Sequence, residues 1–143
     1  MDMALDLAAE AALAGEAPVG AVIVENGEIL ASARNRMRER ADPTAHAELD
    51  AIRLALAARG TGRLDGCDLY VTLEPCAMCA GAIAHARLRR VVYAAADPKA
   101  GAVDNGVRLF DSPACHHRPE VVSGIGERRA AGLLRAFFAD LRR

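Results

Sequence analysis

Residues 68–79 read DLYVTLEPCAMC, and this stretch decides the fold. Its first six residues form a short run rich in β-branched and aromatic side chains, which is typical of a strand. The Glu-Pro pair that follows ends the strand and favours the start of a helix, because proline is tolerated at the first helical position. Cys76 and Cys79 then lie on the same side of that helix, three residues apart. The segment therefore predicts a strand that turns directly into a helix carrying two neighbouring thiols.

Hydrophobic periodicity and turn residues predict the elements on either side. Apolar residues recur at helical spacing up to Gly15, and Asn26-Gly27 is a strong hairpin signal between two short strands. Thr44 can begin a helix that ends near Gly60. In chain order we expect a helix over 3–14, strands over 19–24 and 28–33, an Arg-rich loop over 34–43, a helix over 44–60, a strand over 68–73 with its helix, a strand over 90–94, a weak strand over 120–123 and a helix over 127–141.

The order of these elements indicates an α/β fold, because helices alternate with strands around one hairpin. The helix between the strands at 68–73 and 90–94 is the crossover that a parallel pair requires. We expect a three-layer α/β/α arrangement on a mixed sheet of about five strands, in one domain over residues 1–143. Residues 95–118 lack clear periodicity, and we interpret this long segment as part of a substrate rim.

Composition narrows the class of protein. Hydrophobic residues make up 52% of the 143 residues and aromatic residues only 3%, so the core must be mainly aliphatic. No stretch approaches the roughly 20 apolar residues that span a bilayer, and Asp2 and Asp6 stand where a signal peptide would be basic. We therefore expect a cytoplasmic protein without a membrane partner, in which Cys67 and Cys115 are reduced thiols.

Charge is divided unevenly along the chain. Residues 1–86 carry 7 Lys/Arg against 13 Asp/Glu, whereas residues 87–143 carry 11 against 6. The net charge of the whole chain is −1. The positive C-terminal part permits a basic surface for an anionic substrate, although unpartnered surface arginines would give the same count.

Three residues in two short segments form a candidate metal site. His46 and the pair Cys76 and Cys79 offer one imidazole and two thiolates, and a tetrahedral zinc with three protein ligands keeps its fourth position for water. Glu48 lies two residues past the histidine and is free to move protons to and from that water. This combination resembles the zinc-site signature of nucleobase deaminases.

Two other interpretations of the cysteines are open. A C-x-x-C pair alone also occurs in thioredoxin-like redox sites, but that interpretation leaves His46 and Glu48 without a role. A structural zinc site would need a fourth protein ligand, and the sequence offers four candidates: Cys67, Cys115, His116 and His117.

Longer segments extend the resemblance to one family, the bacterial tRNA-specific adenosine deaminases within the cytidine-deaminase-like superfamily. The likeness covers nearly the whole chain. The matching segments are Ala17–Val22, Asn35-Arg36, Asp42–Glu48 and Leu69–Gly81, and further matches fall at Asp97, Lys99, Gly101, His117-Arg118 and Phe137-Phe138.

The resemblance implies a zinc enzyme that converts adenosine to inosine at the wobble position of a tRNA anticodon, most simply an arginine tRNA. Each subunit would hold one Zn²⁺ with a catalytic water as fourth ligand. Glu48 would deprotonate this water for attack on C6 of adenine, then protonate the ring nitrogen and the departing amine, so that ammonia is released.

The family also implies substrate-binding residues and partners. Asn35 would hydrogen-bond the flipped nucleotide, and Ala17 and Val19 would line its pocket. Phe137-Phe138 would either stack on a base or pack the last helix against the core, and we favour packing for at least one of them. The expected partners are a tRNA anticodon stem-loop and a second copy of the chain that helps shape the RNA surface. Contacts to neighbouring anticodon-loop nucleotides would come from Asp97, Lys99, His117 and Arg118.

Two alternative functions follow from the same site. A deaminase of free guanine, cytosine or cytidine would use the same zinc and the same Glu48 in a smaller pocket. Because a free base has no flanking nucleotides, such an enzyme would not need Asn35, Lys99 or Arg118 to contact them. A catalytically idle zinc-stabilised RNA-binding protein would have no need of Glu48.

Overall fold

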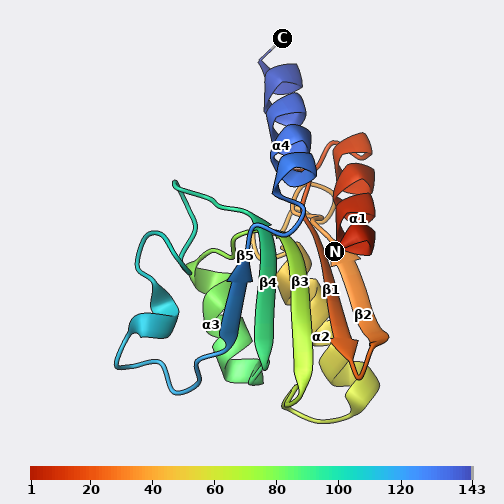
Figure 1. Cartoon of the computed structure of the whole chain (residues 1–143). Coiled ribbons are helices and arrows are strands. Elements are labelled where there is room, and N and C mark those ends of the chain that lie inside the picture. The colour runs from red at the N-terminus through yellow and green to blue at the C-terminus, as the bar shows by residue number, and fades with distance from the viewer. Residues whose placement is uncertain (143) are drawn as a thin grey trace.

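The computed structural model describes residues 1–142 (Figure 1). The elements in chain order are α1 (Asp2–Leu13), β1 (Gly20–Glu25), β2 (Glu28–Arg34), α2 (Ala47–Arg59), β3 (Cys67–Leu73), α3 (Ala77–Ala86), β4 (Arg90–Ala95), the short 3-10 helix η1 (Leu109–Asp111), β5 (Glu120–Ser123) and α4 (Glu127–Leu141). The predicted order of helices and strands is confirmed.

The five strands form one mixed sheet in the order β2-β1-β3-β4-β5. β1 pairs antiparallel with both β2 and β3, whereas β3, β4 and β5 run parallel to one another. Asn26 and Gly27 both have positive φ, which is the backbone of the tight hairpin turn that their sequence predicts. α3 connects the parallel strands β3 and β4, as the crossover rule requires.

Helices cover both faces of the sheet, so the predicted α/β/α layering is confirmed. The main core lies between the sheet and the layer of α2 and α3, and it takes Ile23 from β1, Leu69 from β3 and Ile83 from α3. A smaller core lies under α1 and α4, where Leu5 and Ala130 pack on the end of β4. Figure 1 shows α2 and α3 behind the sheet and α1 in front of it. The core is mainly aliphatic, as the composition predicts.

Two helices begin later than the sequence predicts. The Asp42 carboxylate accepts hydrogen bonds from the Thr44 backbone N–H and hydroxyl, at 2.8 and 2.7 Å, and this turn delays the start of α2 to Ala47. The helix α3 also begins late, at Ala77, two residues after Pro75. The residues that cap the two helices are therefore His46 and Cys76, both with extended backbone.

The first half of α4 packs on the rest of residues 1–142, through Ala130 and Leu134. Ala130 is its buried residue, and the other end of the helix projects past the sheet (Figure 1). The rings of Phe137 and Phe138 meet edge to face at 5.4 Å, but Phe137 is half-buried and Phe138 is 45% exposed. Neither ring belongs to the core, so the expectation that at least one of them packs there is wrong.

Two further expectations concern the thiols and membranes. Cys67 and Cys115 are both free, in agreement with the sequence analysis. Within residues 1–142, every helix is too short or too polar to span a bilayer.

The close approach of α1 to β1 gives a test of the fold. A Cβ on Gly20 would lie 2.1 Å from the Ala4 carbonyl oxygen and 2.9 Å from the Ala8 nitrogen, both in the backbone of α1. We expect Gly20→Ala to lower the free energy of unfolding by about 3 kcal/mol, because the helix must shift. Urea unfolding measures this, with Gly62→Ala as the control, since a Cβ there meets nothing within 4 Å. Equal stability of the two variants would contradict the packing described.

Candidate metal centre and substrate pocket

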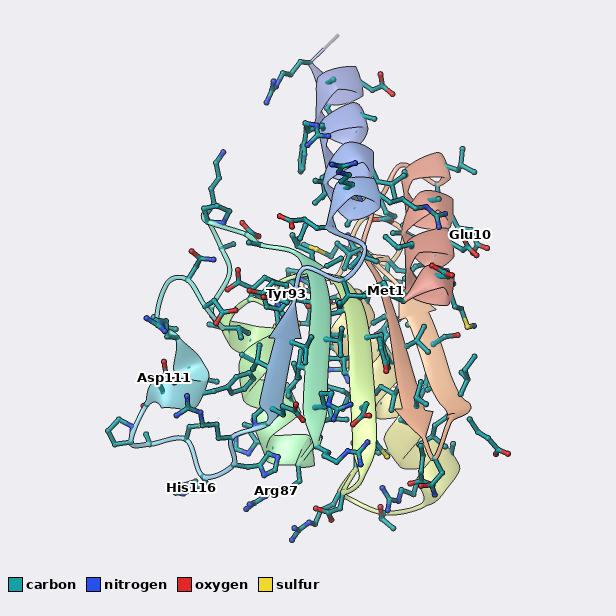
Figure 2. All side chains as sticks on the ribbon, viewed as in Figure 1. Met1, Glu10, Arg87, Tyr93, Asp111 and His116 are labelled. Carbon is teal, nitrogen blue, oxygen red and sulfur yellow. The ribbon has the colours of Figure 1, made fainter. Side chains whose placement is uncertain are left out.

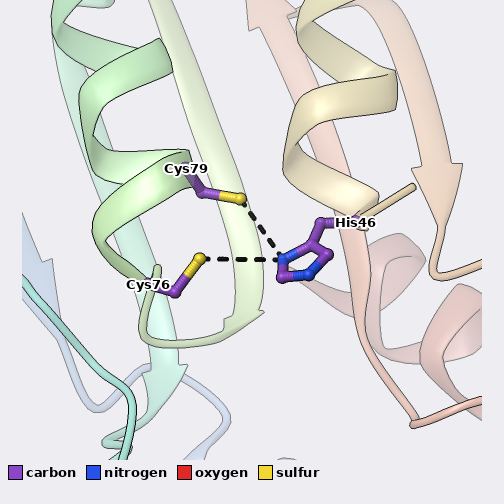
Figure 3. A group of neighbouring side chains, drawn as sticks. All are labelled: His46, Cys76 and Cys79. Carbon is purple, nitrogen blue, oxygen red and sulfur yellow. Dashed lines mark hydrogen bonds between the residues drawn. The ribbon is translucent and has the colours of Figure 1, made fainter. Parts of the chain in front are cut away.

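Three side chains converge where α2 and α3 begin (Figure 3). The Nδ1 atom of His46 lies 3.7 Å from the Sγ atom of Cys76 and 3.6 Å from that of Cys79. Tetrahedral zinc with bonds of about 2.3 Å to sulfur and about 2.0–2.1 Å to nitrogen sets these atoms about 3.6 Å apart. The two nitrogen-to-sulfur separations therefore match those of a zinc site.

The fold brings the three ligands together through two helix starts. His46 and Cys76 are N-cap residues, and Cys79 lies in the first turn of α3, which packs beside α2. Helix N-termini carry partial positive charge, which favours thiolate over thiol. The same end of each helix therefore positions the ligands and stabilises their metal-binding form.

Hydrogen bonding within the group prepares one thiolate. A hydrogen bond from the Cys79 thiol, supported by one from His46, lowers the pKa of Cys76 to about 4. The shared proton raises the pKa of Cys79, and the bond to Cys76 raises the pKa of His46. Cys76 is therefore a thiolate at neutral pH, the form in which cysteine binds metals.

Glu48 lies beside this group but is not one of its ligands. Its side chain is only 4% exposed, and this burial raises the pKa of its carboxyl group to about 6. The carboxyl group interacts with the Cys79 side chain, which places it next to the metal position. A buried carboxylate with a pKa near neutrality is suited to exchange protons with a neighbouring water.

The four candidates for an additional protein ligand do not join the group. Within residues 1–142 the metal-binding cluster consists of three residues. Cys67 opens β3 at the end of that strand away from Cys76, and its thiol contacts Glu25. The Cys115 thiol donates to the carbonyl of His117. Among residues 1–142 the structure therefore does not support a closed structural zinc site.

A cavity of about 160 Å³ adjoins the metal group. Seven of the eleven predicted site residues line it, namely Ala17, Val19, Asn35, His46, Glu48, Cys76 and Asp97. The structure adds Met37, Ala47, Leu73, Glu74 and Ala100, which the sequence analysis did not single out. Among these only Glu74 had a sequence signal, as an acid between a buried strand and the Pro-Cys pair.

Hydrogen bonds hold Asn35 in place and leave the nitrogen of its side-chain amide for a ligand. Its backbone N–H donates to the Val19 carbonyl at 3.0 Å, and its side-chain oxygen accepts from the Met37 N–H at 3.4 Å. Among residues 1–142 its side-chain nitrogen has no hydrogen-bond partner. That nitrogen can donate a hydrogen bond to a nucleotide in the cavity.

Glu74 organises the other wall of the cavity. Its carboxylate, 2% exposed, accepts hydrogen bonds from four backbone N–H groups and one side-chain amide at 2.7 to 3.1 Å. Burial raises the pKa of this carboxyl, but the N–H groups outweigh burial and hold it below its usual range. The donors belong to Asp97, Val103, Asp104 and Asn105, so one carboxylate fixes the loop over 97–105 beside the metal ligands.

Besides the ligand Cys79, three predicted site residues are not part of the cavity lining. Lys99 is exposed on its rim, two residues from Asp97. The imidazole Nε2 of His117 lies 2.6 Å from the carbonyl oxygen of Leu88, beyond the far end of α3. The ten residues of α3 span about 15 Å. Arg118 pairs with Asp111 at 2.7 Å, so a single chain does not bring it or His117 to the pocket.

The Glu74 contacts predict a local effect of substitution. Glu74→Gln replaces one acceptor oxygen by an N–H₂ group facing backbone donors, which we expect to cost about 2 kcal/mol of stability. Limited proteolysis should then cut faster within residues 97–105, while zinc content stays unchanged. Glu120→Gln is the matched control, because within the described part of the chain its exposed carboxylate has one ion-pair partner, Arg90. Faster cleavage spread evenly over the chain would contradict this role for Glu74.

Comparison with known proteins places this site in a family. Residues 1–95, which include all three ligands and Glu48, match the model for the cytidine and deoxycytidylate deaminase zinc-binding region. The chain is 54% identical to the tRNA-specific adenosine deaminase of Agrobacterium fabrum, over 99% of this chain and 93% of that protein.

Solved structures agree with this placement. One from work on A-to-I editing by tRNA:A34 deaminases is 54% identical, with a TM-score of 0.92 over 94% of this chain and 97% of the other. The guanine deaminase of Bacillus subtilis is 40% identical, with a TM-score of 0.65 over 83% of this chain and 79% of the other. With its His-Cys-Cys group and its neighbouring glutamate, the chain belongs to the zinc-binding cytidine and deoxycytidylate deaminase family, among the tRNA-specific adenosine deaminases.

Proposed function

We propose that this protein hydrolyses adenosine to inosine at the wobble position of a tRNA anticodon, with release of ammonia. The observation that carries the proposal is a three-ligand metal group with a non-ligand Glu48 beside it, in a chain 54% identical to a tRNA-specific adenosine deaminase. Residues 1–143 would act as one deaminase domain. An arginine tRNA is the expected species, and the cytoplasm is the expected place of action because tRNA is the substrate.

The roles of the site residues follow from their positions. Bound zinc supplies a water whose pKa is lowered toward neutrality, so that hydroxide is available as the nucleophile. Glu48 would accept one proton from this water and pass it to the adenine ring nitrogen, and would then accept the second proton from the new C6 hydroxyl and pass it to the departing amine. The sum of these steps consumes one water and yields inosine and ammonia. A carboxyl pKa of about 6 lets Glu48 act in both directions near neutral pH.

The cavity is suited to a flipped nucleotide. Ala17 and Val19 give it an aliphatic wall, and the Asn35 amide is directed to the base or ribose. Asp97 lies at its edge, and Lys99 on the exposed rim would meet a neighbouring part of the anticodon loop.

A homodimer explains the two predicted RNA contacts that lie far from the pocket. His117 and Arg118 of one copy would reach the RNA that is bound to the other copy. The layer of α2 and α3 exposes Leu54 and Met78, which are 54% and 38% accessible, and such apolar side chains are suited to a contact between copies.

The second candidate function is deamination of a free base, and the 40% identical guanine deaminase supports it. Higher identity and a higher TM-score favour the tRNA deaminases, because these relatives agree with the chain over nearly its whole length. Substrate can change in this fold by loop variation around an unchanged metal site, so the substrate needs a direct test.

The substrate test uses zinc-loaded protein and a panel of candidates. An arginine tRNA with adenosine at the wobble position is offered beside free adenosine, guanine, cytosine and cytidine. We expect inosine in the tRNA, detected by nucleoside mass spectrometry, and ammonia in equal amount. Turnover of a free base with the tRNA untouched would contradict the proposal and favour the second candidate.

The role of Glu48 predicts a separation of metal binding from turnover. Glu48→Gln should lower the rate of inosine formation by about 10³-fold or more, because it removes the group that moves protons. Its zinc content should remain one per chain. Cys76→Ala is the contrasting variant, and it should lose zinc and activity together. Loss of zinc from Glu48→Gln would show that this glutamate is a ligand instead.

A further inference from the structure

A second cavity, of about 220 Å³, lies at the far end of α3 from the metal group. It opens between that end of the helix and the segment over 109–117. Its polar lining consists chiefly of His85, Arg87, His116 and His117, which we call the histidine groove. Figure 2 shows Arg87 and His116 side by side at this end of the molecule. Only His117 among these four was expected to contact RNA.

The groove has cationic and donor groups, and Asp65, the acid on which the charge of Arg87 acts, lies outside its lining and is bonded to Arg63. Among the described residues that line it, none carries a carboxylate. The nearby Asp111 is occupied by ion pairs with Arg108 and Arg118, at 3.3 and 2.7 Å. The Arg87 guanidinium has no ion pair or side-chain hydrogen bond within residues 1–142, unlike the arginines of the cavity beside α2, where Asp50 pairs with Arg40 and Arg53.

The groove is held in shape by local contacts. Arg87 caps α3 in the left-handed conformation, with φ of 64°, and its backbone N–H donates to the Ala84 carbonyl. The Nε2–H of His117 donates to the Leu88 carbonyl, and the Cys115 thiol donates to the carbonyl of His117. These bonds fix the two segments against each other, and His85, His116 and Arg87 line the groove between them.

We propose that the histidine groove binds a phosphodiester group of the RNA substrate. A phosphate offers only acceptors, and a guanidinium with neighbouring imidazoles offers donors and positive charge. A tRNA is much longer than the roughly 15 Å of α3 that separates the groove from the cavity, so one RNA can occupy both, within one subunit or across a dimer. The proposal rests on the proposed function, because it takes its ligand from that substrate.

The test measures how the affinity for a tRNA anticodon stem-loop depends on salt. Arg87→Gln should reduce the slope of log affinity against log salt by about 0.7 and weaken binding about fourfold at 0.15 M salt. The rate of inosine formation at saturating RNA should not change, because the groove lies far from Glu48. His116→Asn should weaken binding in the same direction, and Arg87→Lys should restore most of the slope.

The matched control is Arg129→Gln, which removes the same charge from an exposed arginine already paired with Asp6 at 2.7 Å. We expect this variant to keep the wild-type slope. Equal slopes for wild type and Arg87→Gln, or equal losses in the two glutamine variants, would overturn the proposal. Urea unfolding shows whether each variant is folded. If Arg87→Gln does not fold, the salt slope of His116→Asn is used for the test instead.

Inorganic phosphate separates a free-anion site from an RNA contact. NMR signals of the groove imidazoles are followed as phosphate is added, and then as the stem-loop is added. Shifts with RNA that are lost in Arg87→Gln would support the proposal. Shifts with phosphate but an unchanged RNA slope would overturn it in favour of a free-anion site. If the wild-type protein forms inosine but the salt slopes of wild type and Arg87→Gln are equal, only the groove proposal is rejected. If no tRNA gains inosine, the proposed function itself is rejected.

Discussion

The separation of three ligand atoms is the constraint on which the rest of the structure depends. His46 Nδ1 must stay 3.6 to 3.7 Å from two sulfurs that belong to a different helix. That separation is set by the packing of α2 beside α3, and small buried side chains such as Ala47, Ala51 and Ala80 allow it. Because these helices rest on the same face of the sheet, the aliphatic core also maintains the geometry of the metal group.

Two buried carboxylates hold the loops around the cavity in fixed positions. Glu16 accepts hydrogen bonds from the backbone N–H groups of Arg38 and Glu39, at 3.0 and 2.7 Å, and so holds the loop that follows Asn35. Glu74 does the same for the loop over 97–105. Both loops lack regular secondary structure of their own, so their backbone donors are satisfied by side chains instead. The substrate pocket therefore has fixed walls before any nucleotide arrives.

Local signals in the sequence predicted most of the fold and the metal group. Asn26-Gly27 identified the hairpin, and the strand-to-helix junction before Cys76 identified the crossover. Helix starts were missed where a side chain such as Asp42 competes for backbone donors. The location of His117 and the histidine groove could not be predicted, because they depend on how residues 95–118 pack against α3. Such long-range placement leaves no periodic signal in a segment without regular structure.

The most direct test of the account is X-ray absorption at the zinc edge of the zinc-loaded protein. A three-ligand site next to a proton-transferring glutamate predicts two sulfurs at about 2.3 Å, one nitrogen at about 2.0–2.1 Å and one further oxygen, with one zinc per chain. A third sulfur or a second imidazole would mean a closed structural site. That result would contradict the central claim that His46, Cys76 and Cys79 leave a position for a reactive water.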